Sequence, residues 1–486
     1  MDDGGSRSLA RTVFGGAGLI TAAGFASRLF GLLSAPILTR ALGPVPYGEV
    51  ALVGTVTSIA TTVALFGIDM SYSRYYFSGL PEESAAVERF CWRFTAAVSI
   101  GVSAAAAAGW WWLGPRAGQH PGYAVMVWAG ILLGAANAMA GLYRRVRGSY
   151  TRISASIVAG GGLGVLLSIV LVLAWRRDAW SLLAGTAGGV AASVAILGLP
   201  GGATIRRSSG LTRSRRWEIM RLGLTAMVTA PLFWLMNSAD RWFLGLWRGE
   251  GELGVYSFAA GLGMIGLMLN NGIMVTWFPE MNRVYEADGE GATASIGRMW
   301  ARLVVSLLVI WVAVSAAGGD VLRLLSDPRF HDGARFVPWI AGGAFFYGVA
   351  LLANTGLFIR KDLTPVAGWW TVGAALNVVL NVGLVRGMGA MGSAVAACLG
   401  FALIAAGVTR SSQARIRLPI PWGRLFAAGG VALACGAALS FPWAVSPVRS
   451  LLVKFPAGVV CAIALTAVVA PDWVRRLLRG DFRSFL

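Results

Sequence analysis

The sequence predicts an all-α membrane protein with about 14 transmembrane helices, two six-helix bundles and two extra C-terminal helices. Two compositional values support this fold class. Hydrophobic residues make up 56% of the chain and charged residues 13%, against about 45–50% and about 25% in soluble domains. Apolar runs of about 20 residues, the length needed to cross a bilayer, recur along the whole sequence.

Each predicted helix is an apolar run bounded by charged, Pro-containing or Gly-containing loops, and its ends are defined to about three residues. The first half holds six such runs and the second half holds eight. They cover roughly residues 15–38, 48–68, 93–113, 123–143, 153–175, 180–200, 219–239, 253–278, 299–318, 336–359, 366–386, 391–409, 424–443 and 450–470.

The distribution of Arg and Lys predicts the orientation. With the N-terminus in the cytoplasm, inner segments carry about 28 cations and outer segments about 12, which agrees with the positive-inside rule. The densest clusters lie near residues 144–152 and 206–221, and Arg241 and Lys454 are counted with the outer segments. The chain starts without the basic stretch and cleavage site of a signal peptide. Both termini are therefore expected in the cytoplasm.

Weak similarity between the two halves predicts an internal repeat. Leu163–Ser168 matches Leu376–Asn381 at an offset of about 213 residues, and loop signals after the first and seventh helices match at a similar offset. The predicted bundles are residues 1–205 and 206–415, with two additional helices and a cytoplasmic tail in 416–486. Six helices per repeat is an even number, so the bundles share one orientation and are related by a pseudo-two-fold axis along the membrane normal.

Several function classes are disfavoured by the sequence. The net charge of +19 is explained by membrane topology rather than by nucleic acid binding. The four cysteines and two histidines have no metal-binding or redox spacing, and there is no phosphate-binding G-x-x-x-x-G-K-[ST] loop. The loops are too short for a catalytic domain. We therefore expect a transporter without cofactors rather than an enzyme.

Four stretches carry a resemblance to a known family. They are Pro36–Pro44 followed by Tyr47-Gly48-Glu49, Asp240-Arg241 with Gly254-Val255-Tyr256, Leu324-Leu325 with Phe330 and Ala334 before Pro338, and Leu376–Asn381 with Gly389–Ala394 beyond. Together they resemble the O-antigen and exopolysaccharide flippases of the multidrug/oligosaccharidyl-lipid/polysaccharide (MOP) superfamily. The resemblance covers about residues 10–410.

The resemblance implies a function. Members of the family move oligosaccharide linked to undecaprenyl pyrophosphate from the inner to the outer leaflet of the bacterial cytoplasmic membrane, for surface polysaccharide biosynthesis. They do so by alternating access of a V-shaped cavity between two bundles, driven by ion or proton gradients. The partners would be the lipid-linked substrate, membrane lipid, and a polysaccharide polymerase with its chain-length machinery.

Arg28 is the sharpest candidate for a substrate ligand. It lies near the middle of the first apolar run, where a charge costs at least about 2.5–3.5 kcal/mol. Gly24, Arg28 and Gly31 share a small, polar helix face, and a guanidinium binds phosphate through two hydrogen bonds. The alternative is a structural ion pair with Asp69 or Asp240.

The remaining candidates are charges and amides in or beside apolar runs. Interfacial charges and helix caps explain the charges as well, and helix–helix packing explains the amides. The predicted substrate-cavity residues are Arg28, Arg74, Asn377 and Asn381, and the predicted ion-coupling or gate residues are Asp69, Asp240 and Arg241.

Three other functions remain open. A lipid II flippase of the same superfamily usually has arginines in helices 1, 2 and 8, whereas helices 2 and 8 have no central arginine here. A multidrug or cation antiporter of the same fold would bind cations, which Arg28 would repel. A membrane polysaccharide polymerase or ligase needs a larger outer loop than the link near 319–335.

Overall fold

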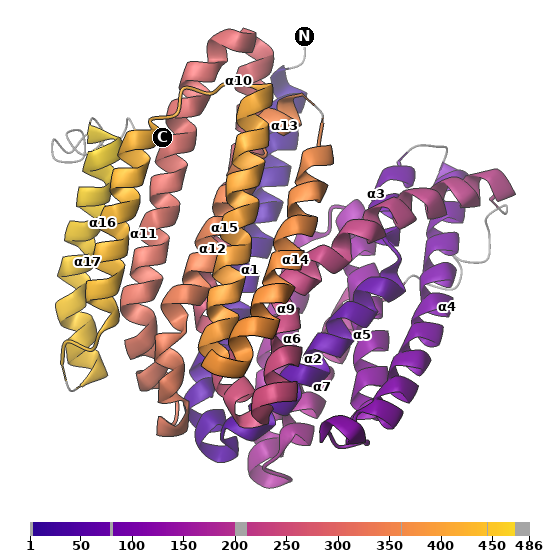
Figure 1. Cartoon of the computed structure of the whole chain (residues 1–486). Helices are drawn as coiled ribbons and strands as arrows, with labels where there is room; N and C mark the ends of the chain where they lie inside the picture. The colour runs from indigo at the N-terminus through magenta and orange to yellow at the C-terminus, as the bar shows by residue number, and fades with distance from the viewer. Residues whose placement is uncertain (1–2, 78–80, 200–210, 361, 445, 472–486) are drawn as a thin grey trace. The chain divides into compact units, whose positions relative to one another are not determined.

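The computed structural model describes residues 3–77, 81–199, 211–360, 362–444 and 446–471, and every regular element in these ranges is helical (Figure 1). The chain forms two compact units, Met1–Trp234 and Leu235–Leu486. The predicted bundle boundaries at residues 205 and 415 stay a prediction. Arg206 and Arg207, from the densest predicted cytoplasmic cluster, lie outside the described residues.

Within the described ranges, thirteen helices are long and apolar enough to cross a membrane. One of them, Leu232–Met274, has 43 residues, which at about 1.5 Å per residue is twice the thickness of a bilayer core of about 30 Å. This helix is broken at Gly249, so it represents two crossings. Thirteen plus one gives fourteen, which confirms the predicted fold class.

The helices cover the predicted apolar runs, but several extend beyond them. The helices of the first and third runs begin 12 residues early, at Asp3 and Pro81, and that of the ninth run covers Thr293–Leu325. The seventh run was expected to end at residue 239, but its helix continues to Gly249 because Trp242–Leu246 is itself apolar. The first unit contains α1 (Asp3–Leu42), α2 (Pro44–Leu65), α3 (Ile68–Tyr75), α4 (Pro81–Leu113), η1 (Pro115–Ala117), α5 (Tyr123–Val146), α6 (Tyr150–Ala174), α7 (Ala179–Leu197) and the start of α9 (Arg213–Gly263). The second contains the rest of α9, α10 (Ile265–Asp288), η2 (Gly289–Ala292), α11 (Thr293–Leu325), η3 (Pro328–Arg335), α12 (Val337–Ala353), α13 (Thr355–Ile359), α14 (Thr364–Met388), α15 (Ala390–Arg415), α16 (Trp422–Ser440) and α17 (Pro447–Val469).

Small residues allow α6 and α7 to pack backbone to backbone. A Cβ atom added at Gly160 would lie 2.9 Å from the Gly189 carbonyl oxygen. Glycine at such positions permits the close approach that drives helix association in lipid. The matching helix pair of the second unit uses the same device, because a Cβ at Gly373 in α14 would lie 3.1 Å from the carbonyl oxygen of Gly400 in α15.

The two units also share their internal packing order. In the first, α5 packs on α2, α4 and α7, and in the second, α12 packs on α10, α11 and α15. Gly43 follows α1 with φ 78° and ψ −178°, and Gly249 adopts φ 83° and ψ 171° at the corresponding place in α9. Only glycine adopts this conformation readily. The paired glycines therefore support the sequence repeat at the level of the backbone.

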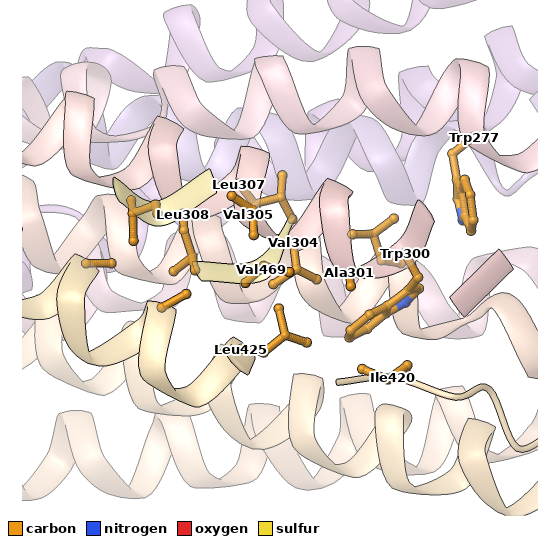
Figure 2. Close-up of a cluster of buried hydrophobic side chains, with 14 of the residues drawn as sticks. Trp277, Trp300, Ala301, Val304, Val305, Leu307, Leu308, Ile420, Leu425 and Val469 are labelled. Atoms are coloured by element: carbon orange, nitrogen blue, oxygen red, sulfur yellow. The ribbon is translucent and has the colours of Figure 1, made fainter. Parts of the chain in front are cut away.

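The last two helices form a hairpin that packs mainly on α11, beside which it lies in Figure 1. An apolar core joins the three helices, and Figure 2 shows Leu425 and Ile420 close to Trp300 and Val304. At one end of this contact the indoles of Trp300 and Trp422 meet edge to face, with ring centroids 5.9 Å apart. α11 is therefore the helix that attaches the hairpin to the rest of the second unit.

Candidate substrate and coupling sites

Arg28 is an exposed cation on a transmembrane helix. The neighbouring face of α1 packs on α6, where Ser27 and Phe30 contact Gly161 and Gly162. Arg28 itself is exposed, and no other residue in the described ranges holds its guanidinium by a hydrogen bond or an ion pair, Asp69 included. Its charge is therefore not neutralised within the described part of the chain, and its role as a substrate ligand stays a prediction.

Asp69 and Arg74 lie at opposite ends of the short helix α3 and are both exposed. An acid in the first turn and a base in the last turn each complement the helix dipole. α3 is fixed in place by Ser71, whose hydroxyl donates to the Ile219 carbonyl oxygen at 2.9 Å. This geometry accounts for both charges without a ligand, and their predicted roles in coupling and substrate binding remain untested.

A buried polar cluster in the first unit was not predicted. The Glu88 carboxylate accepts hydrogen bonds from the Tyr72 hydroxyl at 3.0 Å and from the Arg147 guanidinium at 2.8 Å. Glu88 is only 2% exposed. Burial lowers the pKa of Arg147, but Glu88, Tyr72 and Tyr143 together raise it by more, so its net pKa lies above the usual value. Arg147 is 59 residues from Glu88, and no local sequence pattern connects them.

Asp240 lies inside α9 and is buried, not at a helix end as predicted. One carboxylate oxygen accepts a hydrogen bond from the Tyr256 hydroxyl, and the other accepts from the Arg241 backbone amide at 2.9 Å. The Nε atom of Arg241 is buried without a hydrogen-bond partner. Arg241 therefore lies within α9 with part of its side chain buried. It is not in an outer loop, where the charge count had placed it.

Asn377 and Asn381 lie together on α14 and are almost fully buried, 1% and 0% exposed. The side-chain Nδ2 of Asn381 donates to the backbone carbonyl oxygen of Asn377 at 2.8 Å. The Oδ1 atom of Asn381 accepts from the Ser393 hydroxyl of α15 at 2.9 Å. The Nδ2 atom of Asn377 has no hydrogen-bond partner. These contacts join two helices, as the packing interpretation expected, and the substrate role of the two amides remains a prediction.

Lys454 is a buried cation and not part of an outer loop, which corrects the charge count. Its ammonium group lies 2.6 Å from the Asp320 carboxylate and 3.2 Å from the Ala316 carbonyl oxygen. Ser450 donates to the same carboxylate oxygen at 2.8 Å. Asp320 is on α11 and Lys454 on α17, 134 residues later, so only tertiary structure brings this pair together.

Three kinds of chemistry follow from these positions. Arg28 presents a permanent positive charge suited to phosphate. Asp240 is a shielded carboxylate with a phenol donor, a site able to hold a proton or to release one when its hydrogen bonds change. The Glu88 and Asp320 clusters contain ion pairs that join helices. In the searched residues no group of three or more His, Cys, Asp or Glu could hold a metal.

Comparisons with known proteins give a family and a fold. The model of a family described as polysaccharide biosynthesis protein matches residues 13–284. No curated protein matches the chain. The structure is similar to that of the lipid II flippase MurJ in an inward closed conformation, with TM-score 0.74, 10% identity, and coverage of 94% of this chain and 99% of that chain.

Two MATE transporters are also similar in fold. An inward-facing MATE family transporter of the MOP superfamily has TM-score 0.59 and 14% identity, covering 80% of this chain and 94% of that chain. A mutant of the Vibrio cholerae MATE transporter VcmN has TM-score 0.52 and 12% identity, covering 85% and 98%. At these identities the likeness shows the fold alone.

Proposed function

We propose, because this chain belongs to the polysaccharide biosynthesis protein family, that it is a flippase for oligosaccharide linked to undecaprenyl pyrophosphate. It moves this lipid from the inner to the outer leaflet of the bacterial cytoplasmic membrane, with both of its own termini in the cytoplasm. The observation that carries the proposal is the family match over residues 13–284, more than half of the 486-residue chain. The MOP transporter fold supports it.

Arg28 is the proposed ligand of the substrate's pyrophosphate. An exposed guanidinium in an apolar helix needs water or an anion around it, since lipid tails solvate charge poorly. Pyrophosphate loses water as it enters the protein, and two parallel hydrogen bonds from arginine offset that loss. Arg74, Asn377 and Asn381 are proposed as further polar contacts for the substrate.

Asp240 is the proposed coupling group, with Arg241 beside it and Asp69 as a second gate candidate. A transporter driven by an ion gradient needs a carboxylate whose charge state changes during the cycle. Asp240 is shielded, and its two donors, the Tyr256 hydroxyl and the Arg241 amide, could exchange with a proton or a cation. No second carboxylate in the described ranges contacts this group.

Deletion of the encoding gene tests the proposed function. We expect surface polysaccharide to be lost while lipid-linked oligosaccharide accumulates on the inner leaflet, where an added membrane-impermeant probe cannot reach it. Reconstituted protein should move a fluorescent lipid-linked oligosaccharide between leaflets of a liposome. Normal surface polysaccharide in the deletion strain would contradict the proposal.

A lipid II flippase is the second candidate, favoured by the fold similarity to MurJ. The two candidates share a pyrophosphate-linked lipid and differ in the sugar. Deletion distinguishes them, because loss of a sole lipid II flippase stops growth whereas loss of a surface polysaccharide exporter does not. A multidrug antiporter is disfavoured, since organic cations would be repelled by Arg28.

A further inference from the structure

Two of the four cysteines lie in contact on adjacent helices. The Sγ atoms of Cys435 in α16 and Cys461 in α17 are 2.8 Å apart, and both residues are partly exposed. A disulfide bond is about 2.05 Å long, so the sulfurs need to move together by only about 0.8 Å. Cys91 and Cys398, in contrast, are buried in α4 and α15.

The depth of this pair restricts what can react with it. Cys461 lies 14 residues after Pro447 and 8 residues before Val469, which is roughly 21 Å and roughly 12 Å from the helix ends. Water-soluble disulfides such as glutathione react with thiolates in water, and neither charge nor water is stable at that depth. An oxidant dissolved in the lipid reaches the pair directly, because most of α17 is not buried by protein.

We propose that Cys435 and Cys461 are a redox modification site, at which a lipid-soluble quinone closes a reversible disulfide between α16 and α17. The reaction is balanced within these partners. Two S–H bonds break and one S–S bond forms, and the quinone takes up the two electrons and two protons to become the quinol. The product links the two arms of the hairpin, which otherwise contact each other and α11 through apolar packing and, at one point, the Asp320–Lys454 ion pair.

Thiol counting on the full-length protein in liposomes tests the proposal. The reduced protein is incubated without oxygen with decylubiquinone or with oxidised glutathione, then denatured and labelled with polyethylene glycol maleimide. We expect decylubiquinone to lower the free thiols from four per chain to two, dithiothreitol to restore four, and glutathione to leave four. Cys435→Ser and Cys461→Ser variants should each keep three free thiols throughout.

Three results would overturn the proposal. The wild-type protein could retain four thiols in the presence of the quinone, or the loss could resist dithiothreitol, which indicates a quinone–thiol adduct. The serine variants could also lose thiols, which would place the reaction at Cys91 or Cys398. Because serine is nearly isosteric with cysteine, both variants should fold, and their monodispersity in detergent checks that they do.

Discussion

Arg28 and Lys454 are both cations on membrane-spanning helices, yet their surroundings differ in kind. Lys454 is 3% exposed and has an aspartate at 2.6 Å, so its charge is neutralised within the protein. Arg28 is exposed and has no such partner in the described ranges. At the scale of single residues, the first charge is therefore paired within the protein, whereas no described residue neutralises the second.

Replacing Arg28 should impair transport without impairing folding. For Arg28→Gln we expect flipping of lipid-linked oligosaccharide to fall at least about tenfold, because a hydrogen bond to a charged group contributes about 1.5–3 kcal/mol. Arg28→Lys should retain part of the activity. Liposome flipping assays measure the effect, and Arg40→Gln, at the end of the same helix, is the matched control. Equal rates for Arg28→Gln and the wild type would remove Arg28 from the mechanism.

Asp240 should connect transport to the driving gradient. In Asp240→Asn, we expect flipping to lose its dependence on an imposed ion gradient, while binding of the lipid-linked substrate persists. The amide can still accept from Tyr256 but carries no charge. Asp288→Asn is the control, since Asp288 is exposed at the end of α10. Gradient-dependent transport by Asp240→Asn would show that coupling occurs elsewhere.

The sequence identifies charges in apolar runs but not their partners. Arg28 and Asp240 stand out because a charge within such a run is rare. The Tyr256 hydroxyl that satisfies Asp240, and the pair of Glu88 with Arg147, depend on which helix faces meet. Helix packing sets these contacts, and a single sequence carries no local signal for it.

At the scale of the element, the apolar run length predicts where helices lie, and backbone conformation decides where they break. α5, α6 and α14 begin and end within about three residues of their predicted runs. α9 continues past its predicted end because the following residues are also apolar. The break in α9 occurs at Gly249 because of the backbone conformation of this residue, and not because the sequence becomes polar there.

Gly249→Ala should destabilise the protein through the backbone alone. A Cβ at this position meets nothing within 4 Å, but the glycine φ of 83° is unfavourable for alanine by about 1–3 kcal/mol. Gly261→Ala is the matched control, because Gly261 is helical in the same element and also has open space. Thermal unfolding in detergent should show a lower Tm for the first variant only. Equal Tm values would mean that the turn relaxes without strain.

The Asp320–Lys454 pair should be essential to the docking of the hairpin. Lys454→Met removes the cation 2.6 Å from the buried Asp320 carboxylate and leaves only Arg323 at 3.6 Å, and breaking a buried pair in this way costs up to about 3–5 kcal/mol. Adding Asp320→Leu should recover most of that loss, because apolar residues can replace a buried ion pair at little cost in stability. Thermal unfolding measures both, with the exposed Arg449→Met as control. A double variant less stable than Lys454→Met would show that the carboxylate has another role.

At the scale of the whole molecule, the charge distribution predicts which ends face the cytoplasm. In a cysteine-free background, Glu290→Cys should react with a membrane-impermeant maleimide only after permeabilisation, because the link near residues 279–298 is predicted to be inside. Asp332→Cys should react in intact cells. Both positions are exposed, so access depends only on the side of the membrane. Labelling of Glu290→Cys in intact cells would invert the topology.

The repeat is the feature of the whole chain that sequence and structure share most closely. Leu163–Ser168 and Leu376–Asn381 match in sequence, and each lies on a helix that packs closely on the next one. The repeat therefore shows in the chain order of the helices and in their packing partners. It does not show which face of each helix binds the substrate, since both units bury small and polar residues in the same manner.

The attachment of the C-terminal hairpin to α11 has a practical consequence. Any displacement of α11 must carry α16 and α17 with it, because an ion pair and an apolar core bind them to that helix. A fluorophore attached to the loop between α16 and α17 would thus report the motion of α11, and no label would have to be attached to α12 or α15. The hairpin is therefore a suitable labelling site for recording the motion of the second unit during a transport cycle.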